Sequence, residues 1–250
     1  MIPWIIFFFG LFWGSFLNVV SLKWGDFKSI VRGRSACFHC QKILSYFQLL
    51  PVVSFLVQRG KCRYCGGNIS LRYPIVEITT GLILYLLYQA TIGWINFIFV
   101  GIAFSILLVV SLYDLKTLII PDRLVWSFNI LTFLGIWLAR PYPLNSVDHI
   151  LSGLALFSFF ALLWFVSRGA WMGFGDAKLA LGIGFLLGPH SGPLALVLSF
   201  CIGTISALLL MFLKKDKYSM KSQIPFGPFL ALGAFVSFVW GSKIIEWYLR

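Results

Sequence analysis

The sequence predicts an all-α polytopic membrane protein with about eight transmembrane helices and one small cytoplasmic loop domain. Of its 250 residues, 60% are hydrophobic and only 11% are charged, whereas a soluble domain carries roughly 25% charged residues. Apolar runs recur along the chain, and one polar segment near its start holds four of the five cysteines. The net charge of +12 does not indicate nucleic-acid binding, because cytoplasmic loops of multi-span proteins collect Lys and Arg.

The apolar runs predict the spans and the domain boundaries. The first run covers residues 2–22, and about 20 residues suffice to cross the roughly 30 Å hydrocarbon core. No basic segment precedes this run, so we interpret it as a retained span and not as a cleaved secretory signal. Residues 23–73 form the loop domain, and residues 74–250 form the main membrane domain. Seven further spans are predicted in the main membrane domain, at residues 74–92, 94–113, 124–139, 149–167, 177–190, 193–213 and 226–247.

The basic residues predict which loops face the cytoplasm. With eight spans, all but three of the 20 Lys and Arg residues fall on one side of the membrane; the exceptions are Arg140, Lys243 and Arg250. Because the cytoplasmic side carries the excess of basic residues, the richer side is cytoplasmic and both termini lie outside. The run at 177–190 is short and Gly-rich, but omitting it would place the following basic loop outside, so we count it as a span.

The cysteines predict a metal centre in the loop domain. Two Cys-x-x-Cys pairs are separated by 21 residues, and they consist of Cys37, Cys40, Cys62 and Cys65. Two such pairs can close a tetrahedral thiolate site for a structural zinc ion, and a reducing cytoplasm disfavours disulfides. A redox dithiol is the alternative. With four thiols available, His39 is interpreted as a bystander, and Cys201 is a packing residue in a span.

Three aspartates lie at predicted cytoplasmic helix ends: Asp114, Asp122 and Asp176. An ionisable side chain at the edge of hydrocarbon is costly and is expected to have a partner or a function. For Asp122, capping of the fourth span competes with a role in a site. For Asp114, a surface pair with Lys116 is the alternative to a functional role.

Asp114 and Asp176 are the predicted catalytic pair. Asp114 ends a helix, where the dipole disfavours the ionised carboxyl, while Asp176 precedes a helical run whose dipole favours it. Environments that differ in this way suit an acid and a base acting on one water and one carbonyl. The chemistry predicted is peptide hydrolysis without a covalent intermediate, because no Ser or Cys at this edge has a suitable His partner.

Several neighbouring residues are candidates for supporting roles. They are Gly173, Gly175, Lys178, Pro225, Gly227 and Pro228. The first two glycines allow close backbone approach, and the segment from Pro225 to Pro228 interrupts regular helix, which would expose backbone donors to an extended substrate. Glu77 is predicted either to bind a cation, such as a substrate amino group or a sulfonium, or to form a salt bridge with Arg72.

A set of short motifs resembles the bacterial type IV prepilin peptidases, which are membrane aspartic proteases with a Gly-x-Gly-Asp motif. The resemblance covers nearly the whole chain, and its specificity comes from the order of the motifs. The motifs are Gly14-Ser-Phe-Leu-Asn18, Arg34-Ser-x-Cys-x-x-Cys40, Pro51-x-x-Ser54, Gly60-Lys-Cys-Arg-x-Cys65, Arg72-Tyr-Pro-x-x-Glu77, Asp114-(x7)-Asp122, Ile120-Pro-Asp-Arg123, Gly173-x-Gly-Asp176 and Ile224-Pro-Phe-Gly-Pro228.

The resemblance implies an activity, a substrate class and a location. It implies cleavage of prepilin or pseudopilin precursors after a glycine, at the cytoplasmic face of the bacterial inner membrane, by an aspartic peptidase domain at residues 74–250. Asp114 and Asp176 match the catalytic aspartates of the family. The resemblance also implies N-methylation of the new amino terminus with S-adenosylmethionine. The alternatives are an ion-coupled transporter and a zinc-binding assembly protein without peptidase activity.

Overall fold

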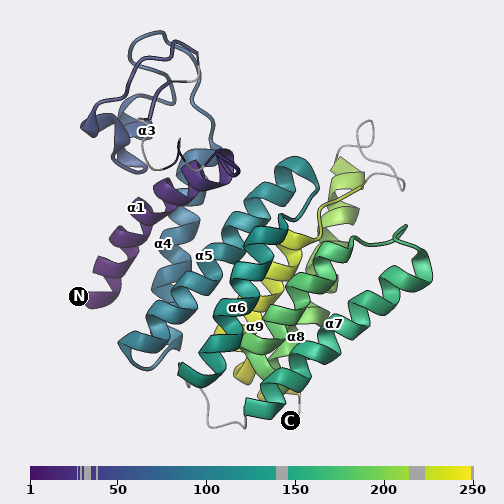
Figure 1. Cartoon of the computed structure of the whole chain (residues 1–250). Helices are drawn as coiled ribbons and strands as arrows, with labels where there is room; N and C mark the ends of the chain where they lie inside the picture. The colour runs from purple at the N-terminus through teal and green to yellow at the C-terminus, as the bar shows by residue number, and fades with distance from the viewer. Residues whose placement is uncertain are drawn as a thin grey trace. The chain divides into compact units, whose positions relative to one another are not determined.

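The chain folds into α-helices that form two compact units, Met1–Gln89 and Ala90–Arg250 (Figure 1). The computed structural model describes residues 1–26, 28, 30, 35–37, 39–138, 146–213 and 223–248. The basic residues Lys214, Lys215, Lys217 and Lys221, as well as Arg34 and Arg140, lie outside the described residues. Each unit is therefore considered by itself, within the described residues.

The first unit pairs two long helices and carries a loop between them. Helix α1 covers Ile2–Leu22 and α4 covers Arg72–Ala90, while the intervening cysteine loop (residues 23–71) contains a 3₁₀ turn, η1 (Tyr46–Leu49), and a short helix, α3 (Val53–Val57). The two long helices run antiparallel in close contact, because small residues face each other. A Cβ on Gly10 would lie 2.7 Å from the Cα of Gly81, and such contacts are typical of helix pairs in membranes.

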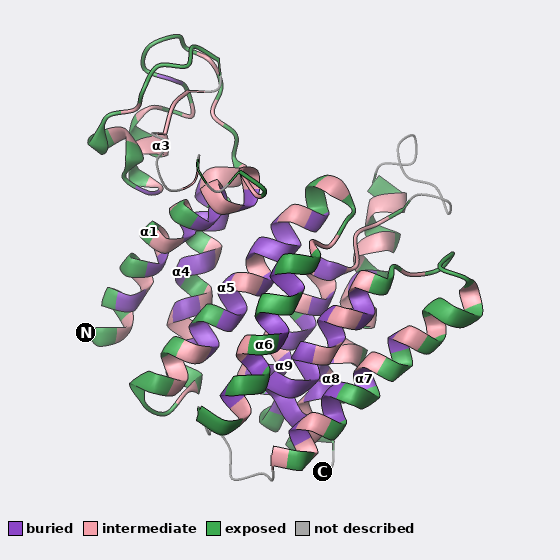
Figure 2. Ribbon diagram, in the orientation of Figure 1, coloured by how far each residue is buried: buried purple, intermediate pink, exposed green. Residues whose placement is uncertain are grey.

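The second unit is a bundle of five helices: α5 (Trp94–Thr117), α6 (Asp122–Leu138), α7 (Ser146–Ser167), α8 (Phe174–Leu213) and α9 (Gly227–Tyr248). Its buried residues, purple on the ribbon of Figure 2, line the inside of the bundle, and the largest fully buried side chains include Phe128, Phe160, Leu107, Leu179 and Ile183. Many large apolar side chains remain exposed on the outside, as expected where lipid covers the surface.

Helix α8 consists of two antiparallel halves that meet at Gly188. This residue has φ 73° and ψ −170°, a conformation that favours glycine. Ala180 from the first half and Ala195 from the second line the same small apolar cavity, and a Cβ on Gly192 would lie only 3.9 Å from the Cα of Gly184, so the chain reverses direction between them. The expected spans at 177–190 and 193–213 are therefore the two halves of one helical hairpin.

The helical segments agree with the predicted spans in number and order. With α8 counted as two halves, the described residues contain eight long helical segments. Five helices, namely α1, α5, α7, α8 and α9, are long and apolar enough to cross a membrane. Helices α4 and α6 are not long and apolar enough by the same measure. Helix α4 nevertheless packs along α1. The helices extend past the apolar runs, as in α5, which continues to Thr117 where residue 113 was the expected end.

Candidate active site and metal centre

Asp114 lies in the last turn of α5 with only 4% of its surface exposed. The helix ends at Leu118, whose left-handed backbone (φ 56°) lets its N–H donate to the carbonyl of Asp114 at 2.8 Å. The side chain points inward, and its Oδ2 accepts a 3.0 Å hydrogen bond from the backbone N–H of Gly227. The alternative of a surface pair with Lys116 is wrong, because Asp114 is buried and its carboxylate bonds to α9.

Asp176 is equally buried, with 6% of its surface exposed. It lies in the first turn of α8 rather than before the helix, and its backbone N–H donates to the carbonyl of Gly173 at 3.2 Å. Its Oδ1 has no hydrogen-bond partner within the described part of the chain. Asp114 lies near enough for the two carboxyl groups to interact electrostatically, so the fold brings together two acids that are far apart in the sequence.

Ile120 packs between the segments that carry the two acids. A Cβ on Gly175 would lie 3.0 Å from the Cβ of Ile120, and a Cβ on Gly227 would lie 3.5 Å from its Cδ1 and 2.8 Å from the Asp114 Oδ2. The absence of side chains at both glycines thus lets three segments converge on one point. Gly173, in contrast, is exposed.

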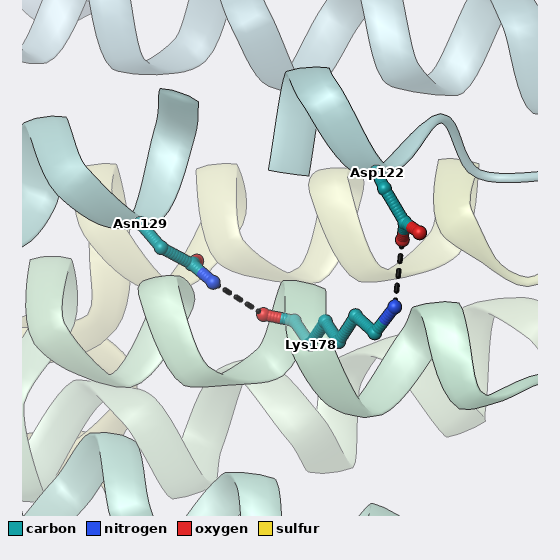
Figure 3. Close-up of polar contacts among 3 residues, drawn as sticks. All are labelled: Asp122, Asn129 and Lys178. Carbon is teal, nitrogen blue, oxygen red and sulfur yellow. Dashed lines mark hydrogen bonds and ion pairs between the residues drawn. The ribbon is translucent and has the colours of Figure 1, made fainter. Parts of the chain in front are cut away.

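Asp122 and Lys178 form an ion pair beside this centre. The Nζ of Lys178 lies 2.7 Å from the Oδ1 of Asp122, and the backbone carbonyl of Lys178 accepts a 3.1 Å hydrogen bond from the Nδ2 of Asn129 (Figure 3). Asp122 is the first residue of α6 and not the residue before it, and it forms a bridge to α8. These contacts tie the start of α6 to the start of α8. The sequence carries no signal that pairs Asp122 with Lys178.

The segment before α9 differs from expectation. Pro225 and Phe226 precede the helix, which begins at Gly227 and continues through Pro228. The sequence predicted free backbone donors here for an extended substrate, but the N–H of Gly227 is bonded to Asp114. The sequence carries no signal for this contact, because it joins residues at opposite ends of the second unit's sequence.

The four cysteines of the loop form one cluster. Their Sγ atoms all lie within 4.8 Å of one another. The two Cys-x-x-Cys segments have the same backbone pattern, since the N–H of Cys37 donates to the carbonyl of Lys42 and the N–H of Cys62 donates to the carbonyl of Gly67. Equivalent positions, Gln41 and Gly66, both have positive φ. The loop therefore contains two copies of one knuckle.

The donor set and its geometry fit a tetrahedral zinc ion. Zn–S bonds of about 2.3 Å place ligand sulfurs about 3.8 Å apart, and the Sγ atoms of Cys37 and Cys65 lie 3.9 Å apart. The backbone N–H groups of Cys40 and then His39 lower the pKa of the Cys37 thiol to about 6, which favours the thiolate that a metal binds. Four thiols leave no open position, as in structural zinc sites.

Glu77 is bonded to a backbone N–H and not to Arg72. It is buried in α4, and its Oε2 accepts a 2.7 Å hydrogen bond from the backbone N–H of Val52. The salt bridge with Arg72 is a prediction that the structure contradicts, because the Nη2 of Arg72 donates to the Oγ of Ser21 at 2.9 Å. Binding of a cation by Glu77 stays a prediction.

The fold and the sites are those of a multi-pass membrane protein with a buried pair of acids and a cysteine-rich loop, and comparisons with known proteins name its family. The model of the bacterial peptidase A24 N-terminal domain matches residues 8–91. The model of the type IV leader peptidase family matches residues 101–208. The four cysteines fall within the first match, and Asp114 and Asp176 fall within the second.

Curated relatives match over nearly the whole chain. A prepilin leader peptidase/N-methyltransferase of Bacillus subtilis is 32% identical over 98% of this chain and 97% of its own length. The protein of the same name from Aeromonas hydrophila is 29% identical over 99% of this chain and 95% of its own length. The one from Legionella pneumophila is 34% identical over 86% of this chain and 75% of its own length. No solved structure matches the chain. The chain belongs to the type IV leader peptidase family, which confirms the resemblance drawn from its motifs.

Proposed function

We propose that this protein cleaves the leader peptide from type IV prepilin-like precursors, using Asp114 and Asp176 as its catalytic pair. The family match and the names of the relatives support the activity. The observation that carries the residue assignment is the meeting of two buried carboxyl groups from α5 and α8, one of which retains an oxygen without a partner among the described residues.

Two adjacent buried carboxyls share one proton, because both cannot ionise at little cost. The ionised carboxyl takes a proton from water as the water oxygen attacks the scissile carbonyl carbon. The protonated carboxyl gives its proton to the carbonyl oxygen, which forms a neutral gem-diol. Collapse of the gem-diol breaks the C–N bond: the protonated carboxyl gives its proton to the leaving nitrogen, and the ionised carboxyl takes a proton from one hydroxyl, which restores the pair. No enzyme-bound acyl group forms at any stage.

Two contacts prepare the acids for these steps. The N–H of Gly227 holds the Oδ2 of Asp114, which fixes the plane of that carboxyl and offsets negative charge on it. The Oδ1 of Asp176 has no hydrogen-bond partner within the described residues, so it is available to a water molecule. The pair of Lys178 and Asp122 supports the arrangement from outside, by holding the start of α8 against the start of α6.

The location proposed for this chemistry is the cytoplasmic face of the bacterial inner membrane, with both termini of the chain outside. The asymmetry of basic residues supports this orientation. A substrate whose apolar segment lies in the bilayer and whose basic leader stays in the cytoplasm would present its scissile bond at the depth of Asp114 and Asp176. Prepilins and pseudopilins both meet this description.

The four-cysteine cluster is proposed to hold one structural zinc ion. Cys37, Cys40, Cys62 and Cys65 would be its ligands, and the ion would supply folding free energy to a loop with little apolar core. The domain arrangement proposed from the sequence follows, with the zinc-binding loop at residues 23–73 between the first span and the peptidase domain.

N-methylation of the new amino terminus is proposed as a second activity on the basis of the relatives' names, with S-adenosylmethionine as the methyl donor. Glu77, the residue predicted to bind it, is buried and already accepts the N–H of Val52. One of its carboxylate oxygens is thus already used, and binding of the cofactor by Glu77 stays a prediction.

The peptidase assignment is tested by replacing each acid with its amide in the purified protein, reconstituted with a prepilin precursor. Asp114→Asn and Asp176→Asn are each expected to lower the cleavage rate by about 10²–10⁴-fold, while the protein still accumulates in the membrane. Asp122→Asn is the matched control and should keep most of the activity. Retained cleavage in either of the first two variants would overturn the proposed pair.

A further inference from the structure

The cysteine loop exposes an unusual amount of apolar surface that neither the metal centre nor the acidic pair uses. In the segment from Tyr46 to Val57, which we call the apolar segment, Tyr46 is 85% exposed, Phe47 82% and Val57 78%. Figure 2 shows exposed residues in and around α3. Large apolar side chains that are exposed together mark an interaction surface, so we expect this segment to bind a partner.

A single hydrogen bond sets the depth of the apolar segment along the helices. The N–H of Val52 donates to Glu77, and Glu77 packs against α1, where a Cβ on Gly14 would lie 2.8 Å from the Cα of Glu77. Gly14 lies eight residues before the end of α1 at Leu22, which is about 12 Å at 1.5 Å per residue. Val52 is thus held beside the length of a membrane-capable helix and not beyond its end.

Several backbone N–H groups of the apolar segment have protein acceptors, as a water-poor environment requires. Buried N–H groups in lipid need protein acceptors, and Glu77 supplies one to Val52. The N–H of Ser54 donates to Leu50 and that of Leu56 to Val52, while η1 begins with a capping box at Ser45. These local bonds give backbone N–H groups of the segment protein acceptors, which they need where water is scarce.

The charged residues that flank the apolar segment within the cysteine loop are basic. Residues 35–71 contain no Asp or Glu, and Arg59 and Lys61 follow the segment directly, both exposed. Anionic lipid headgroups attract basic residues that lie next to a membrane. Apolar side chains beside a purely basic flank therefore fit an anionic bilayer surface better than an acidic or a neutral protein.

We propose that the apolar segment docks into the bilayer on the side of the cysteine loop. Tyr46, Phe47, Leu56 and Val57 insert at the boundary between headgroups and acyl chains, and Arg59 and Lys61 bind lipid phosphates. The membrane thereby holds the zinc-binding loop at its surface. This inference stands on the contacts within the first unit and does not depend on the proposed peptidase activity.

The first test uses the unmodified full-length protein and compares two tyrosines of the same loop. Hydroxyl-radical footprinting in nanodiscs of phosphatidylglycerol and phosphatidylcholine measures the oxidation rates of Tyr46 and Tyr64. By exposure in the chain alone, Tyr46 (85%) should react faster than Tyr64 (46%). Docking reverses this order, because lipid covers only Tyr46. Faster oxidation of Tyr46 in the nanodisc would overturn the proposal.

The second test identifies what covers the apolar segment. A photo-reactive phenylalanine analogue replaces Phe47, Val57 or the control residue Arg63, and crosslinked products are analysed by mass spectrometry. Lipid adducts are expected at positions 47 and 57 and in lower yield at 63. Crosslinks to a second copy, to the rest of this chain or to a precursor would instead assign the surface to a protein. Loss of the lipid adducts in phosphatidylcholine alone is expected, and their full retention would refute the role of anionic headgroups.

Discussion

The backbone N–H of Gly227 donates a 3.0 Å hydrogen bond to Oδ2 of Asp114, although 113 residues separate the two in the sequence. The bond joins the start of α9 to the end of α5. It also places the first residue of α9 so close to the carboxyl group that only hydrogen fits as its side chain, since a Cβ there would lie 2.8 Å from Oδ2. The position of a proposed catalytic acid is thus controlled by a glycine in another helix.

Gly227→Ala should lower the rate of prepilin cleavage without preventing folding. The added methyl group displaces Asp114 and weakens a hydrogen bond to a charged group, which contributes about 1.5–3 kcal/mol, so the rate should fall by about 10- to 100-fold. Gly241→Ala in the same helix is the control, because its Cβ would meet only side-chain atoms at 3.3 Å or more. Equal rates for both variants would show that this hydrogen bond does not matter for activity.

The pair of Asp122 and Lys178 should contribute modestly to stability. Its side chains are 63% and 22% exposed, and partly exposed ion pairs contribute about 0.2–1 kcal/mol. A double-mutant cycle with Asp122→Asn and Lys178→Met, measured by thermal unfolding in detergent, should give a coupling energy in this range. Cleavage should stay within about tenfold of the wild type.

The cleavage assay of these variants also tests the choice between the two acids near α6. Asp122→Asn should retain activity that Asp114→Asn lacks, because Asp122 is exposed whereas Asp114 is buried beside Asp176. The reverse result would move the first catalytic role from Asp114 to Asp122.

One zinc ion per chain is expected in the purified protein. Native mass spectrometry should show a single zinc that disappears in the Cys37→Ser/Cys40→Ser variant and persists in Cys201→Ser, since Cys201 lies in α8 outside the cluster. A metal-free protein with a mass lower by the hydrogens of two disulfides would support the redox alternative instead.

Substitutions at Gly66 should weaken zinc binding in a graded way. Gly66 has φ 68°, and no atom lies within 4 Å of the position of a Cβ there, so the penalty comes from the backbone alone. A left-handed conformation costs about 1–2 kcal/mol for most residues and less for Asn. Gly66→Val should therefore release zinc to a chelator more readily than Gly66→Asn. Gln41, at the equivalent place in the other knuckle, already tolerates φ 56°.

The sequence predicts the membrane-capable helices and the cysteine cluster well, because both depend on local patterns. Long apolar runs can only be helices in a bilayer, and they recur as α1 and α5–α9. The spacing of the cysteines likewise predicts a cluster that the loop forms. The sequence also shows why the Gly-rich run at 177–190 ends where it does. Gly188 and Pro189 interrupt the helix between two apolar stretches.

The contacts between distant segments cannot be predicted from such local patterns. The hydrogen bond from Gly227 to Asp114, the bridge between Lys178 and Asp122, and the bond from Val52 to Glu77 each join groups from different elements. A glycine or a lysine in the sequence does not name its partner, because packing of whole helices decides which groups meet. Sequence patterns therefore single out Asp114, Asp176 and Gly227 as candidates, but they do not name the partners that helix packing gives to Asp114 and Lys178.

The reversal at Gly188 has an effect at the other end of the bundle. The ring of His149 lies against Gly188, where a Cβ would come within 2.8 Å of it, and the Oγ of Ser152 donates to the Gly188 carbonyl at 2.8 Å. Because the chain turns back at Gly188, the second half of α8 ends at the same end of the bundle where the first half begins. Helix α9 therefore starts beside Asp114. A bend remote from the acids thus determines at which end of the bundle α9 starts, and a straight helix in its place would put that start at the end away from Asp114.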